Sequence, residues 1–263
     1  MTSASRDSKY MLKNALKELL LRWGLYYRIN DFRFRHDERN SSQRKFYARF
    51  IGKDDLVFDV GANVGQRTKI FSELGRKVIA IEPQPNCINH LQSRFGSNPK
   101  VIIEAVALAD KEGEATMWES DANVISSMSR TFIETMGQGT FRDNRWDKEI
   151  QVPTKTLDQL ISTHGVPKWL KIDVEGYEQT VLKGLHHPVP FMSFEFAPEL
   201  LADTRLCLET IHQLSDQYRF NYCLGENLEF VLPEHVAYAT FMSETMKEIA
   251  GLNTFGDIYA VLP

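Results

Sequence analysis

Cysteines, long apolar runs and excess positive charge are all scarce in this chain. Its 263 residues include three widely spaced cysteines and no CxxC pair, which argues against a zinc cluster and for free thiols in a reducing cytoplasm. No apolar run approaches the roughly 20 residues that cross a bilayer, and the first residues lack the apolar stretch of a secretory signal. The net charge of -4 argues against a protein built mainly to hold nucleic acid. We therefore expect a cytoplasmic protein with no membrane span and no nucleic-acid partner.

Two phosphate-binding signatures are also missing. The P-loop pattern GxxxxGK followed by Ser or Thr does not occur. The dinucleotide pattern GxGxxG needs three glycines, but VFDVGANVGQ (57–66) has only Gly61 and Gly65, with Asn63 at the place of the middle glycine. A nucleoside without a diphosphate fits this turn better, and a nicotinamide-dependent oxidoreductase remains an alternative.

Short apolar runs alternate with helical segments from residue 55 onward. Such alternation predicts a doubly wound α/β sheet, parallel in its first five strands. These strands are expected at residues 56–61, 77–83, 100–109, 169–176 and 191–197, and two more at 220–225 and 257–263. Ligands of such sheets bind outside the carboxyl ends of the strands, where the strand order reverses.

The first 50 residues differ from the rest. Apolar residues recur on one face of a predicted helix over residues 8–27, which makes it a plausible homodimer element. Residues 28–49 hold seven Arg or Lys against three Asp or Glu. This run is either a solvated surface or a lid that attracts an anionic substrate and brings His36 toward the site. We expect a basic helical extension over residues 1–50 and one domain over residues 51–263.

Three features near the first strands suit a nucleoside. Gly61 permits a sharp turn and close approach of a ligand, and Gly65 leaves the amides of the next helix open. Glu82 ends the second strand and can accept hydrogen bonds from ribose hydroxyls. An apolar wall for adenine would come from Val106, Ala107 and Leu108. Each feature also has a structural interpretation: a turn without a ligand, a capping acid, and core packing.

Charged residues in the fourth strand are candidates for catalysis. Lys171, Asp173 and Glu175 alternate in KIDVEG and would share one face of a regular strand. Glu195 lies near the end of the next strand. One of these carboxylates could remove a proton from an acceptor hydroxyl. The alternatives are an ion pair of Lys171 with Asp173 or Glu175 that only sets local structure, and a Mg²⁺ ion held by the three carboxylates.

Five segments together carry a family resemblance. They are VFDVGANVGQ, IAIEPQP, EAVALADKEG, VPTKTLDQLI and WLKIDVEGYEQTVLKG. On these segments the chain resembles the FkbM family of S-adenosylmethionine-dependent methyltransferases, from about Leu56 to the C-terminus. The resemblance implies the seven-stranded, Rossmann-like class I methyltransferase sheet with an antiparallel last strand. It also implies that the cofactor's amino-acid half is surrounded by Asp59, Gly61, Asn63 and Gly65, its ribose held by Glu82, and its adenine edge approached by Asp110.

The combined prediction is an S-adenosylmethionine-dependent O-methyltransferase that acts on a hydroxyl of a sugar, glycan or other small natural product and releases S-adenosylhomocysteine. N-methylation is less favoured, because IDVEG stands where such enzymes often carry an Asp/Asn-Pro-Pro-aromatic motif. A non-catalytic scaffold is a further alternative. The predicted catalytic residues are Asp173, Glu175, Lys171 and Glu195, with Ala107 and Asp173 among the cofactor-binding residues. In the loop 121–130, the polar side chains of Asn123, Ser126 and Ser127 either contact a ligand or shape a turn.

Overall fold

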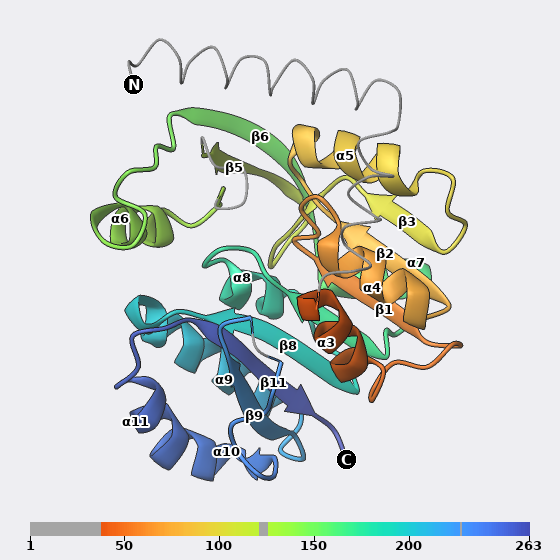
Figure 1. Ribbon diagram of the computed structural model, residues 1–263. Helices are drawn as coiled ribbons and strands as arrows, with labels where there is room; N and C mark the ends of the chain where they lie inside the picture. Colours follow the sequence, from red (N-terminus) through yellow and green to blue (C-terminus); the bar gives the residue numbers. More distant parts are fainter. Residues whose placement is uncertain (1–37, 121–125, 227) are drawn as a thin grey trace, which may run out of the picture. The chain divides into compact units, whose positions relative to one another are not determined.

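The computed structural model describes residues 38–120, 126–226 and 228–263 (Figure 1). The helix expected over residues 8–27 and its dimer role lie outside the described residues, as do most of the basic segment, His36 and Asn123. Chain contacts divide the protein into residues 1–45 and 46–263, and the helix α3 (Glu38–Tyr47) runs across the division. All the described strands belong to the second unit. The extension boundary at residue 50 stays a prediction.

Within the described residues, the main sheet has eight strands in the order β10-β9-β11-β8-β7-β1-β2-β3. Strands β1, β2, β3, β7 and β8 are mutually parallel, and β11 is antiparallel to both of its neighbours. The bounds are β1 (Leu56–Val60), β2 (Lys77–Ile81), β3 (Val101–Glu104), β7 (Trp169–Ile172), β8 (Phe191–Phe196), β9 (Arg219–Leu224), β10 (Val236–Ala237) and β11 (Gly256–Val261). The doubly wound α/β class and its antiparallel last strand are confirmed, and the two-residue β10 adds an edge strand.

The third strand differs from its prediction. Residues 100–109 do not form one strand, because β3 ends at Glu104 and β4 (Ala107–Leu108) joins a second sheet of order β4-β6-β5. That sheet also contains β5 (Gly113–Glu119) and β6 (Lys148–Lys155). The Glu104 carboxylate accepts hydrogen bonds from Lys155 and pairs with His164. After β3 the chain thus leaves the main sheet, and β4 pairs with β6 in the second sheet.

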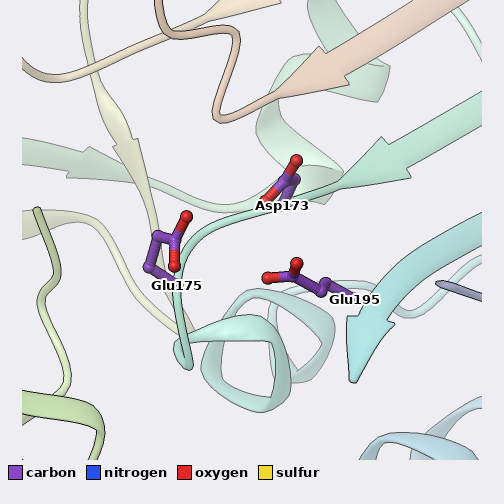
Figure 2. Close-up of side chains that lie close together, drawn as sticks. All are labelled: Asp173, Glu175 and Glu195. Atoms are coloured by element: carbon purple, nitrogen blue, oxygen red, sulfur yellow. The ribbon is translucent and has the colours of Figure 1, made fainter. Parts of the chain in front are cut away.

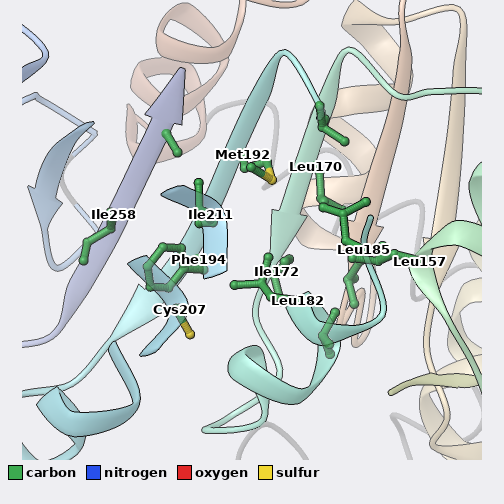
Figure 3. Close-up of a cluster of buried hydrophobic side chains, with 14 of the residues drawn as sticks. Leu157, Leu170, Ile172, Leu182, Leu185, Met192, Phe194, Cys207, Ile211 and Ile258 are labelled. Atoms are coloured by element: carbon green, nitrogen blue, oxygen red, sulfur yellow. The ribbon is translucent and has the colours of Figure 1, made fainter. Parts of the chain in front are cut away.

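Helices cover both faces of the main sheet. One face packs against α7 (Leu157–His164), α8 (Glu178–Lys183) and α9 (Leu201–Leu214) through the cluster of buried side chains in Figure 3. Every second residue of the strands points into this cluster, as a pleated strand requires. Each fully buried Leu, Ile or Phe contributes roughly 1.5–3 kcal/mol relative to an exposed one. The opposite face receives α5 (Pro85–Phe95), whose Leu91 and Phe95 pack on Ala80.

The opposite face also receives α4 (Gln66–Leu74), where Phe71 meets Tyr47 edge-on at 4.8 Å between ring centroids. Tyr47 in turn meets Trp169 of β7 at 5.3 Å. The remaining short elements are α6 (Arg130–Gln138), η2 (Pro198–Leu200), α10 (Tyr238–Thr240), η3 (Phe241–Thr245) and α11 (Met246–Ile249).

Strand register gathers charge on the α4 face. Asp59 of β1 lies opposite Lys171 of β7, and Glu195 of β8 lies opposite Asp257 of β11. Their neighbours in sequence, such as Phe58 and Ile172, belong to the apolar cluster on the other face. Because side chains alternate between faces, one face of the sheet is apolar and the other face carries acids and a lysine. This row of charges leads to the carboxyl ends of the strands.

Candidate active site

A cavity of about 310 Å³ lies where the strand order reverses. The chain runs outward from β1 to β2 and β3, then returns to β7 on the other side of β1. Ligand cavities of proteins typically start at about 300 Å³, and doubly wound sheets place them at such a reversal. Of the residues predicted to act here, the cavity is lined by Asp59, Gly61, Asn63, Glu82, Ala107, Lys171, Asp173, Glu175 and Glu195.

Gly61 is required by the close approach of two strand ends. Its φ is +76°, a left-handed conformation that other L-residues rarely adopt. A Cβ atom added there would lie 1.8 Å from the backbone oxygen of Asp173. Asn63 is also left-handed at φ 49°, and its own Oδ1 accepts a hydrogen bond from the Val64 amide at 2.7 Å. The turn after β1 is thus shaped by one glycine and one asparagine, residues that tolerate this geometry.

Gly65 lies apart from the cavity lining. Its φ is +81°, and an added Cβ would lie 2.4 Å from the ring of Phe95 and 2.8 Å from Leu91. Both contacts are with α5, so packing between the turn and that helix explains the glycine. Gly65 is the N-cap of α4 and has no side chain to cap it. Its contact with a cofactor stays a prediction.

Glu82 is held rigidly at the cavity wall. Only 2% of the residue is exposed. One carboxylate oxygen accepts the Asn63 amide and the other accepts the Gln84 amide, both at 2.8 Å. Burial raises the pKa of Glu82 to about 7, although the two amide hydrogen bonds act in the opposite direction. Each oxygen keeps a further lone pair for a ligand hydroxyl.

The apolar wall predicted from the third strand is present. Val106, Ala107 and Leu108 line the cavity, together with Met117 of β5 and Tyr177. No local pattern marks Met117 and Tyr177 as lining residues, because their positions depend on the second sheet and on the turn before α8.

Two other sequence candidates lie near this wall. Asp110 is exposed and is not among the lining residues, so its place at an adenine edge stays a prediction. Ser126 lines the cavity, whereas Ser127 donates a hydrogen bond to the backbone oxygen of Glu175 at 2.6 Å. Ser127 therefore fastens the segment that follows β7.

The expected alternation of Lys171, Asp173 and Glu175 on one strand face is wrong. Strand β7 ends at Ile172, and Glu175 has a left-handed φ of 53°. The backbone turns here because Glu178 accepts the amides of Val174 and Gly176 at 3.0 and 3.3 Å. After β7, these two backbone amides thus donate to the Glu178 carboxylate instead of to a neighbouring strand.

The turn nevertheless brings three carboxylates together. Figure 2 shows Asp173 and Glu175 on the segment after β7, and Glu195 on β8. Oxygen atoms of the three groups lie within 4.8 Å of one another. Such a cluster is compatible with a divalent cation, but acidic groups also gather without one. The shared location predicted from the sequence is therefore correct, although the strand geometry behind it was not.

Lys171 and Asp173 form a direct ion pair. The Lys171 Nζ atom lies 2.6 Å from Asp173 Oδ2, and 3% of the lysine side chain is exposed against 37% of the aspartate. Burial lowers the pKa of Lys171, but the nearby carboxylates of Asp173 and Asp257 raise it by more, so that the net shift is upward. Lys171 therefore stays positively charged and balances part of the acidic cluster.

Glu175 and Glu195 are the uncompensated members of the cluster. Neither carboxylate has a hydrogen-bond partner among residues 38–120, 126–226 and 228–263. Burial raises the pKa of both groups well above the ordinary value, and the negative charge of Asp173 raises it further. Such groups take up a proton more readily than exposed glutamates.

Sequence analysis missed three charged residues at the site. Arg67 at the start of α4 and Glu226 after β9 line the cavity and approach each other to 2.8 Å. Asp257 faces Glu195 across β11 and β8, and burial raises its pKa. Its signal in the sequence is a lone acid at the head of an otherwise apolar strand, DIYAV. The charge of Lys171 acts in the opposite direction to burial and lowers the pKa of Asp257.

A second cavity of about 710 Å³ adjoins the first. Glu175, Glu195 and Phe255 line both cavities. The second cavity extends between α6 and the start of α9, where Phe132, Phe141 and other side chains form its walls. The acidic cluster thus stands at the junction of two spaces.

The sequence model of the methyltransferase FkbM domain matches residues 59–209, which cover more than half of the chain. The chain belongs to the FkbM methyltransferase family. The matched residues include both the turn at Gly61 and the acidic turn after β7. Membership decides against the nicotinamide-dependent alternative.

Relatives of this FkbM protein span different lengths. The hexuronic acid methyltransferase AglP of Haloferax volcanii is 28% identical over 145 residues, 54% of this chain and 54% of AglP. The chain thus spans about half the length of this curated relative. The crystal structure of methyltransferase FkbM from Methylobacillus flagellatus is 13% identical with a TM-score of 0.46, covering 79% of this chain and 43% of that one. An O-methyltransferase of Thermotoga maritima is 11% identical with a TM-score of 0.39, covering 84% and 65%.

Within residues 38–120, 126–226 and 228–263, no helix is both long and apolar enough to cross a bilayer.

Proposed function

We propose that this protein transfers a methyl group from S-adenosylmethionine to a hydroxyl of a sugar, glycan or other small natural product. The observation that carries the proposal is the position of Glu175 and Glu195 at the junction of the two cavities. Methyl transfer to oxygen needs a donor and an acceptor held in line, and a base beside the reacting hydroxyl. Two cavities that meet at proton-accepting carboxylates provide for both needs.

The smaller cavity would hold the cofactor, which supplies a methyl group that is already electrophilic. Asp59, Gly61 and Asn63 would surround its amino-acid half, and Glu82 would accept the ribose hydroxyls. Support comes from the fixed orientation of the Glu82 carboxylate and from the lining of this cavity, which includes Asp59, Gly61 and Asn63. Ala107 belongs to the apolar wall that would face the adenine ring.

The base in this proposal is Glu175 or Glu195 rather than Asp173. Asp173 already accepts a hydrogen bond from Lys171 at 2.6 Å, so its carboxylate is engaged. A base works best when its pKa lies near the working pH, and the pKa values of both glutamates are raised by burial and by the charge of Asp173. Lys171 would keep Asp173 in place and limit the charge of the cluster.

A sugar acceptor is supported by the hexuronic acid methyltransferase that matches about half of the chain. A nitrogen acceptor is less favoured, because the segment after β7 reads Asp-Val-Glu-Gly and contains no prolines to hold a planar amine.

Calorimetric titration with S-adenosylmethionine, S-adenosylhomocysteine and NADH tests the cofactor. We expect binding of the two sulfur nucleosides and none of NADH. Transfer of labelled methyl groups to a panel of hydroxylated compounds then identifies the acceptor class. Binding of NADH alone would overturn the proposal.

Single variants at the acidic cluster assign the base. Glu175→Gln or Glu195→Gln should abolish turnover while leaving S-adenosylhomocysteine affinity within about threefold, because a base acts only in the transition state. If Asp173→Asn alone has this signature, Asp173 is the base.

A chelator addresses a separate alternative for the same carboxylates. Loss of turnover with EDTA, restored by Mg²⁺, would establish a metal requirement, and unchanged turnover would assign the cluster to proton transfer.

A further inference from the structure

The larger cavity combines apolar walls with acidic groups. Its apolar lining includes Phe132, Met136, Phe141, Phe196 and Leu200. Its charged lining residues are Glu175, Glu178, Glu195, Glu199 and Asp203. In the described part of the chain, no Lys, Arg or His lines this cavity. The walls therefore carry a one-sided negative charge.

Local hydrogen bonds engage only part of these acids. Glu178 accepts two backbone amides of the turn after β7, and Glu199 accepts the hydroxyl of Thr140 at 3.0 Å. Glu175, Glu195 and Asp203 have no hydrogen-bond partner in the ranges that the structure describes. Neutral donors orient a carboxylate but leave its charge in place. Because burial raises the pKa of Glu175, Glu178 and Glu195, the cavity carries its full negative charge at alkaline pH.

We infer that the methyl acceptor is an uncharged or amine-bearing hydroxyl compound with an apolar face, and that acceptors bearing a carboxylate are rejected. The inference rests on the proposed function, because it takes the larger cavity as the acceptor site. A carboxylate placed among unpaired carboxylates is repelled, and like-charge juxtaposition is a common device against wrong ligands. The apolar side chains around Phe132 and Phe141 suit a sugar ring face or an aromatic substituent.

This charge pattern separates the chain from its hexuronic acid-methylating relative. A hexuronic acid carries a carboxylate, and a cavity made for it should present a cation. Here the nearest cation of the cluster, Lys171, lines the smaller cavity and is paired with Asp173. The sequence hypothesis of a basic lid that attracts an anionic substrate concerns residues 28–49, most of which lie outside the described residues. The described walls of the larger cavity instead favour an acceptor that is neutral or positively charged.

Three matched probes test the inference: phenyl β-glucoside, phenyl β-glucosaminide and phenyl β-glucuronide. They share the pyranose ring and the phenyl group, and only the glucuronide carries a negative charge. Binding to the full chain, loaded with S-adenosylhomocysteine, is measured by ligand-observed NMR at mildly alkaline pH, so that the readout does not depend on turnover. We expect the glucoside and the glucosaminide to bind at least about tenfold more tightly than the glucuronide, as like-charge repulsion predicts.

Charge variants of α9 link the ranking to this cavity. Asp203→Asn, alone and with Glu199→Gln, should reduce the difference in binding affinity between the glucoside and the glucuronide. Glu209→Gln is the matched control, because Glu209 is an exposed acid on the same helix and does not line the cavity. The variants should not change the affinity for S-adenosylhomocysteine.

The outcomes separate the two proposals. A glucuronide that binds as tightly as the glucoside would overturn the charge inference, as would the absence of binding by all three probes at millimolar concentration. An equal response of the Asp203 and Glu209 variants would also overturn it. Failure of S-adenosylhomocysteine itself to bind would instead overturn the proposed function, and the acceptor assignment with it.

Discussion

Replacing Gly61 with alanine should damage the site far more than the same change at another left-handed glycine. Gly61 and Gly225 have φ values of +76° and +53°. At Gly225 an added Cβ meets nothing within 4 Å, whereas at Gly61 it would lie 1.8 Å from the Asp173 oxygen. Real Cβ contacts are essentially never shorter than 3.0 Å, so the ends of β1 and β7 must separate. Hydrogen bonds from Gly61 to Ile81 and from Asp173 to Val60, both of 3.0 Å, resist this movement.

The magnitudes follow from these two environments. A left-handed alanine costs about 1–2 kcal/mol in either position. Overpacking against a fixed backbone adds about 1–3 kcal/mol at position 61 only. Urea unfolding of both variants should therefore show a larger loss of unfolding free energy for Gly61→Ala. Titration with S-adenosylhomocysteine should show at least about a tenfold loss of affinity for that variant alone, the worth of one charged hydrogen bond.

Equal destabilisation of the two variants would refute this reasoning. It would mean that the clash with Asp173 is relieved at no cost, and that the glycine is needed for its backbone angle rather than for the close approach of the strand ends. Unchanged S-adenosylhomocysteine affinity in Gly61→Ala would separately refute the place given to this turn in cofactor binding.

Three further predictions concern charge. Lys171→Met removes the cation from the buried acids of β1 and β11, and should lower the unfolding free energy by about 3 kcal/mol; in urea unfolding, the exposed Lys53→Met serves as control. Burial has already raised the pKa of those acids, so this loss should be greatest at alkaline pH and shrink as the pH falls through the raised values. Glu82→Gln should weaken S-adenosylhomocysteine binding about tenfold or more. It should also remove the fall in affinity expected below pH 7, where the Glu82 carboxylate, with a pKa of about 7, becomes protonated. The control Glu104→Gln, at the end of the neighbouring strand, should have neither effect. Asp173→Asn should move the acid limb of the pH–rate profile to lower pH, because its charge raises the pKa of the two glutamates that line both cavities.

Local sequence determined the first half of the site well. The turn after β1 depends on Gly61 and Asn63, and Glu82 stands directly after β2, so strand ends and their neighbours are sufficient to place them. The helix α7 begins at a capping box of Thr156 and Gln159, and ends before Gly165. These features depend on residues that are close in the chain, and a pattern can reveal them.

Features that depend on distant partners were not visible in the same way. The turn at Glu175 is fastened by Ser127, which lies 48 residues earlier in the chain and donates a hydrogen bond to the Glu175 backbone oxygen. The split of the third strand depends on β6, more than 40 residues further along the chain. The larger cavity needs α6 and α9 to lie next to each other, and no alternation of apolar residues encodes that contact.

Glu175 and Glu195 stand on the boundary of both cavities, and this has a thermodynamic consequence. With S-adenosylmethionine in the smaller cavity, the two glutamates would face one positive charge more than they face with S-adenosylhomocysteine. Their protonation, and hence the affinity of the larger cavity, would then differ between the substrate-loaded and product-loaded protein. Such coupling is reciprocal: an acceptor that binds more tightly in the presence of the charged donor must itself tighten the donor by the same factor. The shared carboxylates would thus help the protein to retain the donor and the acceptor together and to release S-adenosylhomocysteine.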